Sequence, residues 1–137
     1  MLGPGLLRIH HRGREALARV QSAPLDPEAY HELRKRAKDL RYTVDFLEPV
    51  WPEVLSVWAS ELHVLTDRLG EGNDLTVLLH NLDVRPPLGR GLDTDLLTWT
   101  IRDIRSTRWA AGLELATRFW AQPSEDFVRE VLGWAEA

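Results

Sequence analysis

Residues 31–45 read HELRKRAKDLRYTVD, and the rest of the chain is organised around this stretch. At about 100° per residue it forms a helix with two distinct sides. One side is an ordinary core stripe of Leu33, Ala37, Leu40 and Val44, which continues beyond the stretch to Leu47. The opposite side, called the basic strip below, contains His31, Arg34, Lys35, Lys38, Arg41 and Tyr42. At roughly 1.5 Å per residue, the strip is about 16 Å long.

No acidic residue belongs to the basic strip. Like charges one turn apart repel each other by a few tenths of a kcal/mol, whereas a surface selected for stability mixes the two signs. A solvated helix surface is the ordinary interpretation, but uncompensated charge of this kind is typical of a site for a polyanion. Beyond the strip, Asp45 can hold the Arg41 guanidinium, and Arg36, beside the core stripe, is expected to pair with Glu32.

The chain has 137 residues, of which 44% are hydrophobic and 28% charged, so we expect one globular domain over residues 1–137. It has no cysteine, which excludes disulfides, thiolate metal ligands and a cysteine nucleophile. No apolar run is long enough to span a membrane, and the N-terminus lacks the apolar core of a signal peptide. A cytoplasmic protein is therefore expected.

The net charge of −4 hides an asymmetry along the chain. Residues 1–41 carry nine Lys/Arg and five Asp/Glu, a balance of +4, whereas residues 42–137 carry eight and sixteen, a balance of −8. Concentration of positive charge in the first third favours a local anion site over a generally basic surface.

Helical patterns cover nearly the whole chain, and no strand pattern is convincing. We expect helices over 5–21 (after a flexible Gly3-Pro4-Gly5 lead), from the cap Asp26 to about Glu48, over 52–69, from Asn73 or Asp74 to about Asp83, from Asp93 or Thr94 to Ala121, and from the Gln122-Pro123 break to the C-terminus. Gly70 and Gly72 are expected to turn the chain, and 85–91 is expected to be a mobile loop. The predicted fold class is all-α, an antiparallel helical bundle of long helices with short connecting helices.

The third of these helices has the most regular apolar pattern. Its seam recurs at steps of four and three and consists of Trp51, Leu55, Trp58, Leu62, Leu65 and Leu69. This spacing is typical of a helix packed against near-parallel neighbours. The chain has six tryptophans, and we expect them to pack in the core rather than to stack on a ligand.

Sequence motifs for catalysis and metal binding are missing. There is no Gly-rich phosphate loop, no HExxH and no nucleophile elbow. His10 and His11 are adjacent, so on a helix they point about 100° apart and cannot easily share a metal. His63 and Asp67 are one turn apart, a spacing more typical of a surface hydrogen bond. No catalytic residue, metal or cofactor is predicted.

The run HELRKRAKDLRY resembles the signature of the CHAD family, the conserved-histidine α-helical domain. The family's His, Arg, Lys, Arg and Tyr match His31, Arg34, Lys38, Arg41 and Tyr42 in order and spacing. LLRIHHRGREALA (6–18) is similar to the Arg-rich helix that precedes the signature, and LGEGNDLTVL (69–78) to the family's LG-x-x-x-D turn. The likeness covers most of residues 5–83 and, more weakly, the final helices.

The resemblance implies an all-helical, non-catalytic domain that binds inorganic polyphosphate along a basic groove. A line of cations at regular helical steps suits a linear polyanion, with Arg offering paired donors and Lys a mobile charge. The first helix could supply a second wall if it packs antiparallel to the second. The predicted polyphosphate-binding residues are Arg8, His11, Arg12, His31, Arg34, Lys35, Lys38, Arg41 and Tyr42.

The chain departs from the family in carrying the His-and-Arg helix once instead of twice. Three explanations are open. This single half of the usual domain can bind anions on an open face, or two copies of the chain can associate to replace the duplicated domain. Alternatively, the chain can be one domain of a longer protein. We expect a homodimer that brings the two basic strips onto one face or into one groove and that polyphosphate tightens. The alternative functions are an accessory domain of a polyphosphate or phosphate-ester enzyme, nucleic-acid binding through the same strip, and a purely structural module. Only Asp45 and Glu48 lie near the strip to bind a catalytic metal, and only Tyr42 accompanies it for base stacking.

Overall fold

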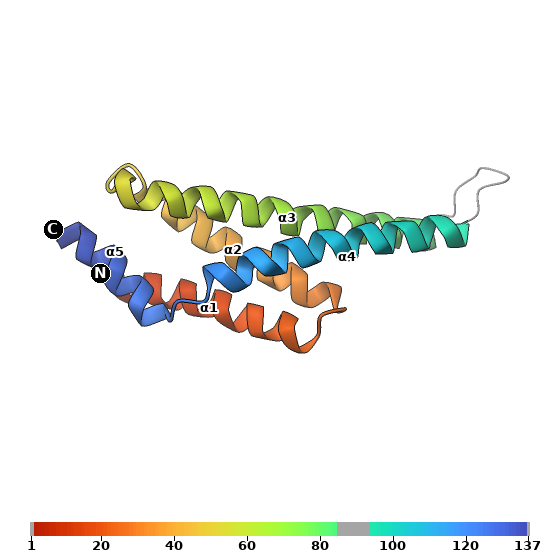
Figure 1. Cartoon of the computed structure of the whole chain (residues 1–137), viewed down its shortest axis with the longest axis horizontal. Helices are drawn as coiled ribbons and strands as arrows, with labels where there is room; N and C mark the ends of the chain where they lie inside the picture. The colour runs from red at the N-terminus through yellow and green to blue at the C-terminus, as the bar shows by residue number, and fades with distance from the viewer. Residues whose placement is uncertain (1, 85–93, 137) are drawn as a thin grey trace.

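The computed structural model describes residues 2–84 and 94–136, without the side chains of 84, 94 and 134–136, and all regular structure there is helical. The helices are α1 (Leu2–Ser22), α2 (Pro27–Leu47), α3 (Pro52–Val84), α4 (Thr94–Phe119) and α5 (Ser124–Glu136). Each of α1, α2 and α3 packs on the next helix in the chain, and α5 lies against α1 (Figure 1). The predicted all-α bundle is confirmed. No helix in the described ranges has the length and apolar character needed to cross a membrane.

Helices α1 and α2 form as the sequence predicts, except that α1 begins earlier than expected. Asp26 caps α2 by accepting a hydrogen bond from the Glu28 amide at 3.0 Å, and Pro27 occupies the first helical position. The predicted core stripe of α2 is buried throughout. The expected flexible lead at 3–5 is wrong, because α1 already begins at Leu2. Pro4 falls within the first turn of α1, where a missing amide proton costs no hydrogen bond.

The expected turn at Gly70 and Gly72 is also wrong, because α3 runs without a break to Val84. A glycine within a helix costs roughly 1 kcal/mol relative to alanine, so packing must compensate. At Gly72 the indole of Trp109 lies directly on the α3 backbone, where a Cβ atom would overlap it. These glycines therefore let neighbouring side chains approach α3. The loop expected over 85–91 lies outside the described residues.

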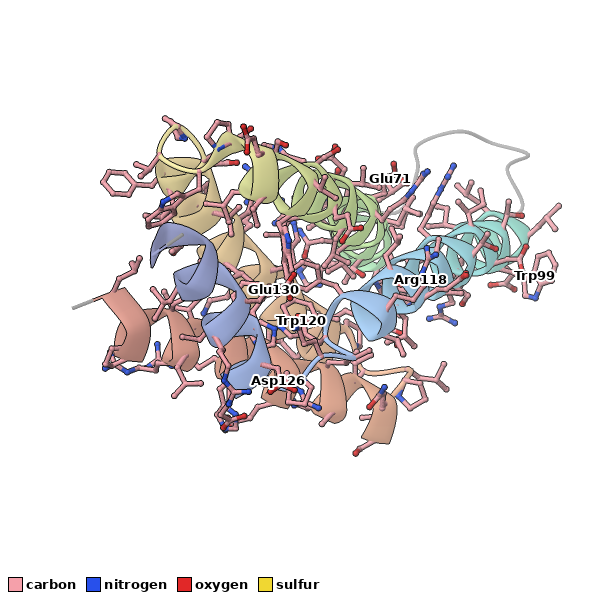
Figure 2. All side chains as sticks on the ribbon, turned by 60° about the vertical axis from the view of Figure 1, so that its left-hand side comes forward. Glu71, Trp99, Arg118, Trp120, Asp126 and Glu130 are labelled. Atoms are coloured by element: carbon pink, nitrogen blue, oxygen red, sulfur yellow. The ribbon has the colours of Figure 1, made fainter. Side chains whose placement is uncertain are left out.

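The core is formed by buried residues of all five helices and contains most of the aromatic side chains. The α3 seam is confirmed, with Leu55, Leu62, Leu65 and Leu69 buried and the two tryptophans half-buried against them. Trp109 is buried and stacks on Tyr30 of α2 at a ring distance of 4.1 Å. Trp120 is buried near α1 and α5 (Figure 2). Trp99 is instead exposed near the far end of α4, and the side chain of Trp134 lies outside the described residues.

Helix α5 docks on α1 through a buried histidine. The Nδ1 atom of His10 lies 2.7 Å from the Ser124 hydroxyl oxygen, and the imidazole stacks on the Phe127 ring at 4.4 Å. Burial, together with the nearby Arg14 guanidinium, lowers the pKa of His10 from 6.5 to about 4. The folded protein therefore holds this ring neutral at pH values where an unfolded chain protonates it.

Stability is expected to fall as the pH drops from about 6.5 towards 4. The pKa of His10 is lower in the folded state than in the unfolded state, so below pH 6.5 the unfolded chain takes up the proton first. Between pH 7 and pH 5 this linkage removes about 2 kcal/mol of unfolding free energy. Urea unfolding at the two pH values measures it. His10→Gln should show a smaller difference between them, and an equal difference in the variant would refute the role of His10.

Candidate functional site

The basic strip lies on the side of α2 opposite its core stripe, along the line where α2 meets α3. His31, Lys35 and Tyr42 are exposed, whereas Arg34, Lys38 and Arg41 are half-buried. The first three face solvent, and Arg34 and Arg41 lean towards α3. The strip is thus a cationic edge supported on one side by a second helix.

Arg41 is held in place by α3. Its Nη1 atom donates a hydrogen bond to the Thr66 hydroxyl oxygen at 2.8 Å, and its guanidinium carbon lies 5.1 Å from the centre of the Tyr42 ring. The Thr66 hydroxyl is buried and donates to the carbonyl of Leu62, one turn earlier. This neutral partner orients the guanidinium without cancelling its charge, so Arg41 keeps its capacity to bind an anion.

Arg34 lies against α3 one turn further along, at Gly70. A Cβ atom at Gly70 would lie 3.3 Å from Nε and 3.5 Å from Nη2 of Arg34. A side chain at this position would therefore press on the guanidinium. The Nε atoms of Arg34 and Arg41 are both buried without a hydrogen-bond partner among the described residues. Two partly desolvated guanidinium groups are thus fixed in a row, and an anion would have to bind their terminal nitrogens, because the Nε atoms are buried.

No ion pair with an acidic side chain reaches Arg34, Lys38 or Arg41 anywhere in the described ranges. The expected contact between Asp45 and Arg41 is wrong, because the Asp45 carboxylate lies 3.0 Å from Nε2 of His63 on α3. His63 is accordingly not paired with Asp67. The positive charge predicted for these three residues is therefore not neutralised by any acidic side chain that the structure describes.

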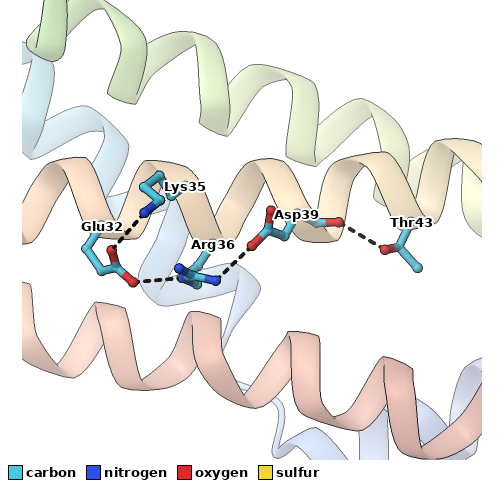
Figure 3. A network of polar contacts seen from close by, with 5 residues as sticks. All are labelled: Glu32, Lys35, Arg36, Asp39 and Thr43. Carbon is cyan, nitrogen blue, oxygen red and sulfur yellow. Dashed lines mark hydrogen bonds and ion pairs between the residues drawn. The ribbon is translucent and has the colours of Figure 1, made fainter.

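The other side of α2, facing α1, is neutralised by paired charges (Figure 3). Arg36 donates to Glu32 at 2.8 Å and to Asp39 at 3.0 Å, which confirms the predicted Arg36–Glu32 pair. The hydrogen bond from Arg36 lowers the pKa of the Glu32 carboxyl. Glu32 also reaches Lys35 at 3.8 Å, so Lys35 is the one strip cation with an acidic partner in the described ranges.

The basic residues of α1 do not face Arg34 and Arg41 across one groove. Arg12 lines a groove of about 510 Å³ between α1 and α2, on the side where Arg36 and Glu32 lie. Arg8 and His11 line a second groove of about 360 Å³ next to Glu125 of α5, and His11 pairs with Glu15 at 2.8 Å. The packing of α1 against α2 is as expected, but the two-walled groove is not formed by these side chains.

Two α3 residues that sequence reasoning did not assign to the site support it, namely Thr66 and Gly70. From the sequence, Gly70 is expected to be a turn residue, and its spacing of four from Thr66 places both on one side of α3. The register between α2 and α3 places Thr66 at Arg41 and Gly70 at Arg34. This register exists only in the folded protein.

A family model described as the CHAD domain matches residues 2–83, which include α1, α2 and nearly all of α3. No curated protein and no solved structure matches the chain. The matched region contains the whole basic strip and the α3 residues that support it, but neither α4 nor α5.

Proposed function

The chain belongs to the CHAD domain family, and from this premise we propose that its basic strip binds inorganic polyphosphate as a non-catalytic module. The observation that carries the proposal is the row of Arg34, Lys38 and Arg41, which have no acidic partner among the described residues. Their uncompensated charge supports an anionic ligand, and the likeness to the family supports polyphosphate as that ligand.

The shape of the site favours a linear polyanion over a single phosphate group. Arg34, Lys38 and Arg41 follow one another at steps of four and three residues, or about 6 Å and 4.5 Å along the helix axis. Such a row offers one contact after another to a chain that carries charge on every unit. Lys35 and the exposed His31 and Tyr42 would add contacts from the solvent side, whereas Arg8, His11 and Arg12 would contribute only where a long chain extends over α1.

Binding is expected to weaken steeply with salt, because association with a charged polymer releases condensed counterions. If three or four phosphate charges are neutralised, the affinity should fall roughly 10- to 200-fold between 50 and 200 mM salt, by analogy with nucleic acids. Titration of a polyphosphate of defined length at several salt concentrations measures this slope. Absence of binding at low salt, or an affinity indifferent to salt, would refute the proposal.

The competing functions are separated in the same assay. Single-stranded DNA with the same number of phosphates tests nucleic-acid binding and should compete less well, because the exposed rings of α2, Tyr42 and Phe46, lie one turn apart at one end of the strip and do not accompany Arg34 and Lys38. Incubation with polyphosphate and Mg²⁺, followed by measurement of released orthophosphate, tests an enzyme. Equal binding of DNA, or orthophosphate released in proportion to protein, would contradict a dedicated polyphosphate-binding module.

A further inference from the structure

Helices α3 and α4 form a long hairpin, one end of which extends past α1 and α2 (Figure 1). Two sets of contacts identify its two sides. On one side, Arg108 of α4 lies 3.4 Å from Glu71 of α3. On the other side, Arg105 donates to Thr76 at 3.2 Å and lies over the Trp109 ring, which in turn stacks on Tyr30 of α2. The side marked by the Glu71–Arg108 pair therefore faces away from α2.

Apolar residues continue from this ion pair along both helices. Leu75, Leu78 and Leu82 follow Glu71 at steps of four, three and four, and Ile104 and Leu97 precede Arg108 by four and eleven residues. Because Glu71 and Arg108 touch, residues at helical repeats from them lie on the same side of the hairpin. Leu78 and Ile104 are exposed, and Leu75, Leu82 and Leu97 are only half-buried.

The same surface extends in the other direction along the hairpin. Val64 and Val57 precede Glu71 at steps of seven, and both are exposed. Next to them, a groove of about 180 Å³ lies between α3 and α4, lined by Glu61, Leu65, Leu115, Arg118 and Phe119. We call this whole surface, from Val57 to Leu82 on α3 and from Leu97 to Arg118 on α4, the outer hairpin face. Its exposed apolar residues are 41–59% accessible.

We propose that the outer hairpin face binds a second copy of this chain, so that two hairpins pack into a four-helix core. Residues 57–82 span about 38 Å, and two adjacent helices are about 20 Å wide. The face therefore offers roughly 700 Å², close to the roughly 800 Å² that each partner contributes to a standard stable interface. Soluble monomers rarely leave contiguous apolar patches of more than a few hundred square ångströms exposed.

The charges on the outer hairpin face favour a second copy over a strongly charged partner. Its described charged residues are of both signs, namely Glu61, Arg68, Glu71, Arg108 and Arg118, and three of them already pair with one another at 3.4–3.9 Å. Each face has a net charge of only +1 from these residues, so two such faces repel each other far less than two basic strips, each of which has four lysine and arginine residues. A face built of two apolar rows is also complementary to itself under two-fold rotation, as an interface between identical subunits requires.

Self-association through this face leaves every residue of the basic strip outside the contact, because the strip belongs to α2. The dimer therefore does not depend on polyphosphate, and its test is independent of the proposed function. It also gives one assembly two strips, so a long polyphosphate that spans both should bind more tightly than a short one.

Sedimentation equilibrium without polyphosphate tests the proposal on the full chain. Leu78→Asp with Ile104→Asp should raise the dimer dissociation constant at least tenfold. Val77→Asp is the matched control, because Val77 is the neighbouring residue on α3, is 51% exposed and points about 100° away from Leu78. All of these side chains are exposed, so the variants should retain the far-ultraviolet circular dichroism of the wild type.

Three results would overturn the proposal. The first is a wild-type chain that stays monomeric at about 100 μM, because interfaces of this size have dissociation constants of roughly micromolar or below. The second is a dimer that the paired substitutions leave intact, which would place the interface elsewhere. The third is equal dissociation by Val77→Asp, which would show that the orientation of the face is wrong.

Discussion

Lys38→Ala is expected to weaken polyphosphate binding by about 5- to 150-fold, the equivalent of one charge-assisted contact of roughly 1–3 kcal/mol. Lys38 lies between Arg34 and Arg41 in the strip and forms no ion pair with any described residue. Its removal therefore leaves no buried group without a partner. Isothermal titration at low salt, with one polyphosphate of defined length, measures the change.

Arg36→Ala provides the matched control on the same helix. Arg36 faces α1 and is committed to Glu32 and Asp39, so its loss should change the affinity only slightly. Some weakening is expected, because Glu32 becomes free to draw Lys35 away from the ligand. A loss as large as that from Lys38→Ala would show that the ligand binds on the α1 side of α2.

Arg34 should contribute more to polyphosphate affinity than its charge alone. Arg34→Lys retains the positive charge but loses the planar fork that lies against Gly70 and that can bind two phosphate oxygens. Its affinity is expected to fall, though less than that of Arg34→Ala. Equal affinity of Arg34→Lys and the wild type would mean that only charge matters at this position.

Gly72→Ala is expected to lower the free energy of unfolding by about 2 kcal/mol, although alanine is the better helix former. The added Cβ atom would overlap the indole of Trp109, which is held between Tyr30 and Arg105 and cannot easily move. The overpacking cost exceeds the gain in helix propensity. Thermal unfolding should show a Tm lower by roughly 5–10 °C.

Gly5→Ala is the control of opposite sign. Gly5 lies within α1, and a Cβ atom there would have no other atom within 4 Å. The substitution should therefore be neutral or stabilise the protein by up to about 1 kcal/mol. If both variants raised the Tm, the close contact between Trp109 and the α3 backbone would not explain why position 72 is a glycine.

The helices and their buried sides could be predicted from local pattern alone. The cap at Asp26, the core stripe of α2 and the seam of α3 all follow from the periodicity of apolar residues and from residues that favour helix ends. The same periodicity separated Arg36, paired with Glu32, from the strip cations. These features depend only on the direction in which a side chain leaves its own helix.

The roles of Gly70, Gly72 and His63 could not be predicted from the local sequence pattern. Gly70 and Gly72 carry the local signal of a turn, yet α3 continues through both, because Arg34 and Trp109 need the space that a side chain would fill. His63 suits a contact with Asp67 within its own helix but meets Asp45 of α2 instead. In each case the deciding partner lies on another helix.

The sequence by itself therefore determined the all-α fold class, the segmentation of most helices and the cationic side of α2. Only the tertiary structure decided which neighbours each side of α2 meets. It set the register that places Thr66 under Arg41 and Gly70 under Arg34, and it separated Arg12 from both. The physical reason is that helical periodicity is a property of successive residues, whereas register and close approach depend on how distant helices fit together.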